Sequence, residues 1–383
     1  MNDKKEFKID ILRSFDELPF NQKIVLWGAG ETGQEFARAA KGLRPDLEIV
    51  CYIDSYRTQS ENSIPIRTPF ALTELIDCQV IITSVFWSEI SKIIDTEYKV
   101  KYKIISNELI NQSSHLRSYG PFYFNAQQSE DVEKRFSQIV NFFPNNKDRE
   151  LLRKLFDLRL YRKEAEFFEY SEALAQQQKK SFKDNDKYSR HIDLNEVANV
   201  IEGGIFDGQD TYRLLEILRK NVGFKKIYAF DPFLDSYYSG DFSKKIDEKL
   251  CEFHENVLWN QNERIAFSID KINPANSCVL TGDALLGKDD VAVHDAITID
   301  SFVEKNQINI DLIKLDVEGS EMKVLQGGEQ TIKRYHPKMA VSLYHVKEHL
   351  FEIPEFLIAC NPSYNFSISM SGPTFVDMVL YAS

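Results

Sequence analysis

Apolar runs of strand length recur along two stretches of the chain and alternate with segments of helical spacing. In the first stretch, residues 21–110, the runs lie at 23–27, 48–53, 79–84 and 101–106. In the second, from Val197 onward, they lie at 197–202, 225–230, 277–282, 310–315 and 338–344. Helices are expected around 208–221, 243–260, 320–335 and 346–360. Strands that alternate with helices predict a parallel sheet covered by helices, so both stretches are predicted to be α/β.

The pattern changes at the end of the chain and in its middle. The runs 364–370 and 375–382 have only Ser-Gly-Pro-Thr between them, which allows a hairpin and leaves no room for a helix. Residues 111–194 are polar and predict a helical connector that either packs against a lobe or forms a wall of a substrate cleft. The sequence thus predicts a smaller α/β domain over 1–110, this connector, and a doubly wound sheet over 195–383. That sheet is expected to have five parallel strands and a C-terminal antiparallel hairpin.

Composition limits the possible partners. Apolar residues make up 43% of the chain and charged residues 28%, as in a soluble globular protein. The formal net charge of −12 argues against a nucleic-acid or anionic-membrane partner, because both select clustered positive charge. No apolar run approaches the roughly 20 residues of a membrane span, and the N-terminus has no signal-peptide core. The five cysteines form no CxxC pair, which indicates reduced thiols and a cytoplasmic location. The oligomeric state is left open, a homodimer included.

A glycine-rich turn follows the predicted strand that ends at Glu202. Glycines there let the backbone approach a ligand, and the helix that begins near Gly208 offers free N–H groups. The next strand ends in Asp231, 23 residues after Gly208, where an acid is placed to hold the hydroxyls of a ribose. The alternative is a plain turn, with Asp231 capping the segment that follows. The candidate cofactor-binding residues are Glu202, Gly204, Asp207, Gly208, Asp231 and Asp283.

A cluster of charges surrounds the end of the predicted strand 310–315. Lys314 lies within an apolar strand, so its ammonium needs an acidic partner; Asp316 or Glu321 would serve if the lysine merely braces the turn. Asp316 and Glu318 follow at the carboxyl end of the strand, the edge at which open α/β sheets bind ligands. Carboxylates this close repel one another, so they require a cation or shifted pKa values. The candidate catalytic residues are Asp316, Glu318, His345 and Lys314.

A second glycine motif lies in the first α/β stretch. Gly28, Gly30 and Gly33 follow a strand as G-x-G-x-x-G, and Asp54 ends the next strand, 21 residues after Gly33. This is the dinucleotide fingerprint in its expected setting. The domain is short and residues 1–110 carry no catalytic constellation, so three interpretations stay open. They are a Rossmann-like structural or substrate-presenting module, a nucleotide or nucleotide-sugar site, and an NAD site.

The C-terminal stretch resembles the FkbM-type methyltransferases. Its segment Lys314 to Glu321, Lys-x-Asp-x-Glu-Gly-x-Glu, is similar to the family's most specific signature. The glycine turn is similar to the first motif of the family, with Glu202 in place of Asp and Ile205 in place of Ala. Five β-α units closed by a hairpin are also the layout of a class I methyltransferase. The resemblance covers 195–383 and implies S-adenosylmethionine as the cofactor and a hydroxyl of a small molecule, sugar or glycan as the acceptor.

The resemblance does not decide which group activates the acceptor hydroxyl for methyl transfer. The sulfonium methyl is already electrophilic, so the protein has to align the acceptor oxygen and exclude water. A sugar-type hydroxyl then needs a base, Asp316 or His345, which are expected to meet at the sheet edge because their strands are neighbours. Alternatively, a divalent cation held by Asp316 and Glu318 lowers the pKa of the hydroxyl.

Two other interpretations compete with this one. His345 and His349 match the H-x-x-E-H pattern of zinc peptidases, which requires a long helix, whereas His345 is expected at a strand end. The other is an NAD- or nucleotide-sugar-binding protein whose methyltransferase domain has drifted from activity. The departures at Glu202 and Ile205 favour that drift.

Overall fold

The computed structural model describes residues 10–55, 57, 63–84, 87–105, 109, 124, 129–161, 167, 170–171, 174, 187–268, 278–279, 291–370 and 378–383. The chain divides into two compact units: 1–126 with 157–172, and 127–156 with 173–383. The division falls within helix α5 (Asn146–Tyr161), so the segment expected to form a connector contributes residues to both units.

The first unit contains a parallel sheet of six strands in the order β1-β6-β5-β2-β3-β4. The four predicted strands are present, and a two-residue strand lies at each edge. The strands are β1 (Ile11–Leu12), β2 (Lys23–Trp27), β3 (Glu48–Ile53), β4 (Ile66–Arg67), β5 (Gln79–Ile82) and β6 (Tyr102–Ile105). The helical segments are η1 (Phe15–Glu17), α1 (Glu31–Leu43), η2 (Pro69–Thr73), α2 (Trp87–Ile93) and η3 (Ile94–Tyr98).

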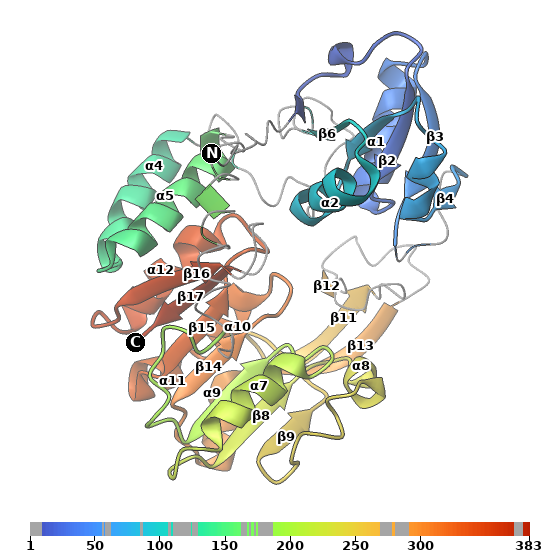
Figure 1. Cartoon of the computed structure of the whole chain (residues 1–383). Helices are drawn as coiled ribbons and strands as arrows, with labels where there is room; N and C mark the ends of the chain where they lie inside the picture. The colour runs from blue at the N-terminus through green and yellow to red at the C-terminus, as the bar shows by residue number, and fades with distance from the viewer. Residues whose placement is uncertain are drawn as a thin grey trace, which may run out of the picture. The chain divides into compact units, whose positions relative to one another are not determined.

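The second unit contains a seven-stranded sheet in the order β16-β17-β15-β14-β7-β8-β9 (Figure 1). Its strands are β7 (Asn199–Gly203), β8 (Lys226–Phe230), β9 (Cys251–His254), β14 (Leu312–Leu315), β15 (Lys338–Ser342), β16 (Phe366–Met370) and β17 (Met378–Ala382). The strands from β15 to β9 pair in parallel, whereas β17 pairs antiparallel with β15 and with β16. The predicted class, five parallel strands with an antiparallel C-terminal pair, is confirmed.

Helices cover this sheet. Leu312 and Ile313 are both fully buried although successive strand residues point to opposite faces, so both faces are covered. Helix α7 packs through Leu214 and Leu218 on the face that carries Leu312. The helices are α4 (Ser129–Ile139), η6 (Val140–Phe142), α7 (Gln209–Leu218), α8 (Asp235–Ser239), α9 (Ile299–Asn306), α10 (Glu321–Gly327), α11 (Glu329–Tyr335) and α12 (His349–Cys360).

One predicted helix is wrong, and one predicted strand belongs to another sheet than the one expected. The third parallel strand is β9, which lies inside the range 243–260 expected to be helical. Of the predicted strand 277–282, the described pair Cys278–Val279 is β12 and belongs to a separate four-stranded sheet. That sheet has the order β10 (Val257–Leu258), β13 (Val291–Ile297), β11 (Glu263–Ser268) and β12. The alternation of Cys251 and Phe253 with polar residues is the period of a strand, but over four residues it is too short to override the helical spacing around it.

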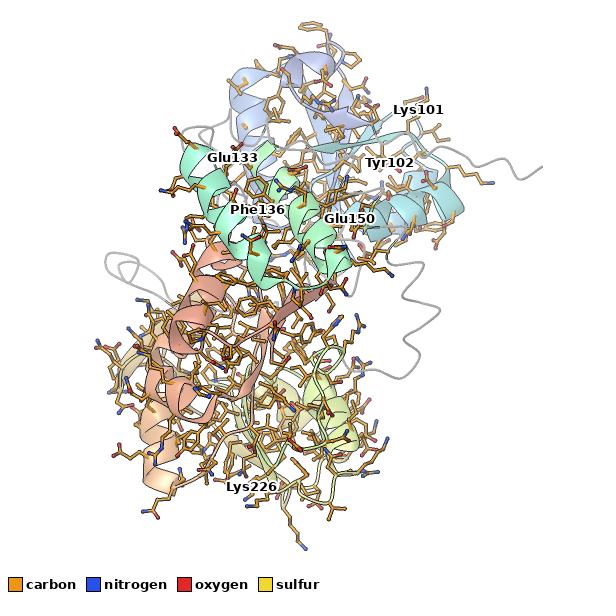
Figure 2. All side chains as sticks on the ribbon, turned by 90° about the vertical axis from the view of Figure 1, so that its left-hand side faces the viewer. Lys101, Tyr102, Glu133, Phe136, Glu150 and Lys226 are labelled. Atoms are coloured by element: carbon orange, nitrogen blue, oxygen red, sulfur yellow. The ribbon has the colours of Figure 1, made fainter. Side chains whose placement is uncertain are left out.

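Helix α4 belongs to the second unit and contacts α12. Arg135 of α4 binds Glu355 of α12 through two hydrogen bonds of 3.0 and 2.7 Å. Phe136 lies between α4 and α5 (Figure 2), where its ring centroid is 4.2 Å from that of Phe156. Among the described residues, no helix is both long and apolar enough to cross a membrane.

Candidate active site

The glycine turn after β7 is shaped by close backbone contacts. Gly204 has a φ of +83°, and a Cβ on it would lie 1.8 Å from the carbonyl oxygen of Asp316. Gly208, the N-cap of α7, has a φ of +80°, and a Cβ there would lie 2.7 Å from the ring of Tyr237. Both positions therefore require glycine. Asp207 accepts a hydrogen bond from the amide of Gln209, at 2.9 Å, and so stabilises the first turn of the helix.

Asp231, at the end of β8, holds this turn. Its Oδ2 accepts hydrogen bonds from the amides of Ile205 (2.8 Å) and Phe206 (3.2 Å). Its Oδ1 accepts one from the amide of Phe233, at 2.8 Å. The carboxylate is thus fixed beside the glycine turn, at the sheet edge where the sequence predicts the ribose of a cofactor.

A cavity of about 250 Å³ opens at this edge of the sheet. Six of the predicted site residues line it: Gly204, Asp207, Asp231, Lys314, Asp316 and Glu318. Ile205 is one of the lining residues, and the cavity stays open beside it. Glu202, Gly208 and His345 are not among its lining residues. Asp283 lies outside the described residues.

The side of the cavity near Asp231 is apolar. Phe233 and Phe267 line it, and their ring centroids are 5.5 Å apart in an edge-to-face arrangement. Phe267 belongs to β11 of the small sheet, which the sequence pattern did not resolve. Aromatic side chains of this kind offer a flat, water-excluding surface for a heterocyclic ring.

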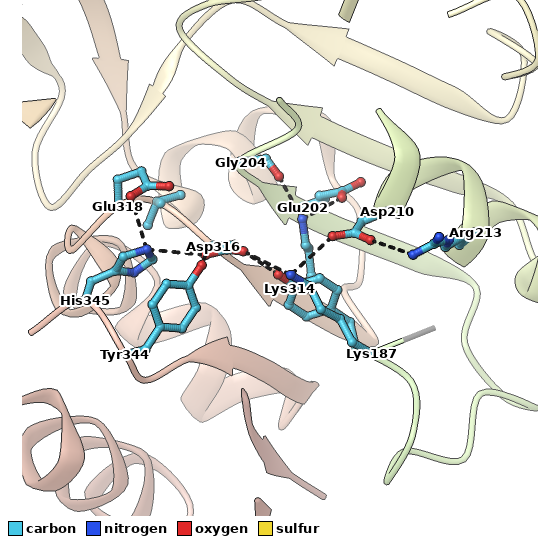
Figure 3. Close-up of polar contacts among 12 residues, drawn as sticks. Lys187, Glu202, Gly204, Asp210, Arg213, Lys314, Asp316, Glu318, Tyr344 and His345 are labelled. Atoms are coloured by element: carbon cyan, nitrogen blue, oxygen red, sulfur yellow. Dashed lines mark hydrogen bonds and ion pairs between the residues drawn. The ribbon is translucent and has the colours of Figure 1, made fainter. Parts of the chain in front are cut away.

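Lys314, which lines the cavity, forms a buried ion pair with Glu202 (Figure 3). Lys314 Nζ lies 2.9 Å from Glu202 Oε1 and donates a second hydrogen bond, of 2.7 Å, to the carbonyl oxygen of Gly204. Burial alone would lower the pKa of Lys314. The nearby carboxylates, of which Glu202 has the largest effect, outweigh burial and raise that pKa. Burial also raises the pKa of Glu202, although Lys314 opposes this. The partner predicted for Lys314 was Asp316 or Glu321; the structure provides Glu202 instead.

Asp316 accepts hydrogen bonds from two tyrosines. The hydroxyl of Tyr344 donates to Oδ1 at 2.9 Å, and the hydroxyl of Tyr188 donates to Oδ2. Lys187 Nζ lies 3.7 Å from Oδ2. Burial disfavours ionisation, but the charges of His345 and Lys187 and the hydrogen bond from Tyr188 outweigh it, so the pKa of Asp316 is lowered.

His345 is surrounded by carboxylates. Its Nδ1 lies 2.8 Å from Glu321 Oε1, and its Nε2 lies 3.2 Å from Glu318 Oε2 and 3.7 Å from Asp316 Oδ1. Burial lowers the pKa of the ring, but Glu321 and Glu318 more than compensate and raise it well above its ordinary value. Ion pairs to Asp316, Glu318 and Glu321 therefore join the end of β14, the turn that follows it and the segment after β15.

Comparison with known proteins identifies part of the second unit. Residues 202–368 match the family model of the methyltransferase FkbM domain. They form an FkbM methyltransferase domain. The chain is accordingly an S-adenosylmethionine-dependent methyltransferase, as the carboxylate signature predicted. No functionally curated protein matches the sequence.

Among the solved structures that match, one is similar in fold over nearly the whole chain. The crystal structure of methyltransferase FkbM from Methylobacillus flagellatus KT is 15% identical, has a TM-score of 0.58, and matches over 95% of this chain and 90% of its own. An O-methyltransferase from Bacillus cereus in complex with SAH is 14% identical with a TM-score of 0.32, over 57% of this chain and 90% of that chain. CalS11, a TDP-rhamnose 3'-O-methyltransferase, is 13% identical with a TM-score of 0.29, over 69% and 98%. The first match extends the similarity in fold beyond the FkbM domain.

The first unit, outside the FkbM domain, has a glycine turn of the same design. Gly28 has a φ of +121°, and a Cβ on Gly33 would lie 1.9 Å from the carbonyl oxygen of Gly28. Asp54 Oδ2 accepts a hydrogen bond from the amide of Ala29, at 3.0 Å. The structure thus brings Gly28, Gly33 and Asp54 together, and Gly30 is the N-cap of α1. A nucleotide, nucleotide sugar or NAD at this turn stays a prediction.

Two residues at or beside the cavity, Lys187 and Tyr188, were not predicted from the sequence. Both precede the glycine turn in the chain. Lys187 lines the cavity, and its Nζ lies 3.4 Å from Asp210. Tyr188 is buried against Asp316, and Lys314 Nζ lies 4.6 Å from its ring centroid. Both come from a polar segment that carries no strand or motif, so only the folded chain reveals them.

Proposed function

We propose that the enzyme transfers the methyl group of S-adenosylmethionine to a hydroxyl oxygen of a sugar, a glycan or a related natural product. The observation that carries this proposal is a single cavity with two chemically different ends. One end has Asp231, the glycine turn and aromatic side chains; the other has Asp316 and Glu318.

The first end suits the adenosyl part of the methyl donor. Asp231 is placed for the ribose hydroxyls, and a carboxylate that meets two hydroxyls makes charge-assisted hydrogen bonds. Phe233 and Phe267 flank the position expected for the adenine ring. Bound in this way, the donor directs its sulfonium end toward the carboxyl end of β14.

The second end suits a polyhydroxylated acceptor. Asp316 and Glu318 offer acceptor oxygens for hydroxyl groups, and Lys187 offers a donor. Because His345 does not line the cavity, direct contact with the acceptor falls to Asp316 rather than to the histidine. Rate acceleration then comes from alignment of the oxygen with the C–S bond and from the exclusion of water.

Calorimetry with S-adenosylhomocysteine tests the donor site. Asp231→Asn should weaken binding at least about tenfold, because a charge-assisted contact is lost. Asp54→Asn, the equivalent change in the first unit, is the matched control and should leave the affinity unchanged. NAD is titrated separately; if the chain binds NAD and not S-adenosylhomocysteine, the proposal is wrong and the drifted-domain alternative is favoured.

The acceptor class is tested by turnover. The enzyme is incubated with isotopically methyl-labelled S-adenosylmethionine and panels of nucleotide sugars, free glycans and phenolic natural products. Mass spectrometry should find the label as an O-methyl ether on a member of the sugar panels. Label on nitrogen, or on phenols alone, would contradict a sugar-hydroxyl acceptor.

A further inference from the structure

His345 presents a ring nitrogen to two carboxylates at the cavity wall. Its side chain is nine-tenths buried, and Nε2 contacts these carboxylates at ion-pair distance without the geometry of a hydrogen bond to any described residue. Figure 3 shows Nε2 facing Glu318 on one side and Asp316 on the other. The distances are 3.2 Å to Glu318 Oε2 and 3.7 Å to Asp316 Oδ1. Two carboxylate oxygens thus lie within 3.7 Å of one buried ring nitrogen.

The other ring nitrogen is held by a fully buried carboxylate. Glu321 Oε1 lies 2.8 Å from His345 Nδ1 and also accepts hydrogen bonds from the amides of Val317 (3.1 Å) and Gly319 (3.4 Å). Glu321 is therefore fixed by the turn and orients the imidazole. A histidine whose far nitrogen is bound to a buried carboxylate is typical of a metal ligand, because that contact sets the tautomer and the ring plane.

We propose that His345 Nε2, Asp316 and Glu318 bind a divalent first-row ion, Mn²⁺ or Zn²⁺, at the wall of the cavity. Asp316, Glu321 and His345 present ligand atoms within 4.8 Å of one another. Because Glu321 already contacts two backbone amides and the rings of His345 and His349, we assign it the orienting role and give the third ligand position to Glu318. The side chain of Glu318 is 42% exposed, so it is free to adjust.

The spacing and the donor set fit such an ion. Ligand atoms at about 2.1 Å from one metal lie about 3.0–3.4 Å from each other, close to the two distances around Nε2. One imidazole with two carboxylates favours Mn²⁺ or Zn²⁺ over Ca²⁺ and Mg²⁺, which prefer oxygen alone. Asp316 and Glu318 line the cavity, so the remaining coordination positions face the place proposed for the acceptor.

The role of the ion rests on the proposed function, whereas its site does not. An acceptor hydroxyl bound to the ion loses its proton to solvent more readily, because the ion lowers the pKa of a coordinated oxygen. The oxygen then forms the C–O bond as the C–S bond breaks, and the donor leaves as a neutral thioether. The catalytic step thereby needs no nitrogen base.

Direct ion binding is the test. The full chain, purified without a histidine tag and stripped with a chelator, is titrated with Mn²⁺ while the electron paramagnetic resonance signal of the free ion is recorded. One ion per chain is expected, with spin-echo modulation from a bound imidazole nitrogen. His345→Gln should remove that modulation and weaken binding at least about tenfold, and Glu321→Gln should weaken it by about 10–100-fold.

Controls separate this inference from the proposed function. His336→Asn changes an exposed histidine and should leave Mn²⁺ binding unaltered. If His345→Gln fails to fold, Glu318→Gln at the partly exposed position replaces it. The inference is overturned if stripped protein that still binds S-adenosylhomocysteine takes up no Mn²⁺ or Zn²⁺, or if His345→Gln binds the ion as tightly as the parent. If the protein binds the ion but not S-adenosylhomocysteine, the proposed ion site stands and the proposed function is wrong.

Discussion

Lys314 and Glu202 are register partners on the neighbouring parallel strands β14 and β7, and their side chains form an ion pair of 2.9 Å with 3% and 0% exposure. Removal of one member leaves an uncompensated buried charge, which costs about 3–5 kcal/mol. We therefore expect Lys314→Met to destabilise the protein by that amount, measured by urea unfolding. The double variant Lys314→Met with Glu202→Leu should recover most of the loss, because apolar pairs of similar volume often replace buried ion pairs. A double variant as unstable as the single one would mean that the hydrogen bond from Lys314 to Gly204 matters more than charge.

Asp316→Asn is expected to abolish turnover while the affinity for S-adenosylhomocysteine stays within a few-fold. Asparagine has nearly the size of aspartate but lacks its negative charge, which accepts hydrogen bonds from two tyrosines and lies near Lys187. The measurement pairs a methyl-transfer assay with calorimetry. A large loss of cofactor affinity would place Asp316 at the donor rather than at the acceptor.

Asp148, in the first turn of α5, makes stability depend on pH. It is 5% exposed, and burial raises its pKa to about 6, against the opposing effect of a hydrogen bond to Ser367. The folded-state pKa therefore lies above the unfolded value near 4, so the native state binds more protons between about pH 4 and 6. Stability from this group falls as the pH rises through that window. Asp148→Asn should raise the free energy of unfolding by about 1–2 kcal/mol at neutral pH and by little below about pH 4. Urea titrations at several pH values decide this; a constant difference at all pH values would contradict it.

Gly33→Ala should disrupt the first unit. The added Cβ would lie 1.9 Å from the carbonyl oxygen of Gly28, and backbone cannot move aside cheaply. We expect a loss of about 3 kcal/mol, seen as a lower unfolding midpoint. Gly30→Ala is the matched control, because nothing lies within 4 Å of its added Cβ; its cost should stay near or below about 1 kcal/mol. Equal effects of the two substitutions would show that the contact between Gly28 and Gly33 is not what requires glycine.

The sequence predicted those parts of the molecule that depend on a local pattern. The strands around Gly28 and Gly204, the terminal hairpin and the carboxylates after β14 all follow from periodicity and short motifs. The meeting of Asp316 and His345 followed from the order of their strands, and the structure places their side chains 3.7 Å apart.

What the sequence could not give depends on register and on distant segments. The sequence predicted that Lys314 needs an acidic partner. Which acid it meets depends on the register in which β14 pairs with β7, and the sequence of neither strand alone determines that register. Tyr188 reaches Asp316 from a segment 128 residues away in sequence. Strand β9 is four residues long, so its alternation was too brief to compete with the helical spacing around it.

The contact between Gly204 and the carbonyl oxygen of Asp316 leaves no space even for a methyl group. The turn proposed to hold the donor and the strand end proposed to hold the acceptor therefore touch directly through main chain, within one cavity. Mutation of the lining residues can alter how tightly each substrate is held. The separation between the two proposed binding positions is set by the backbone and should persist through such changes.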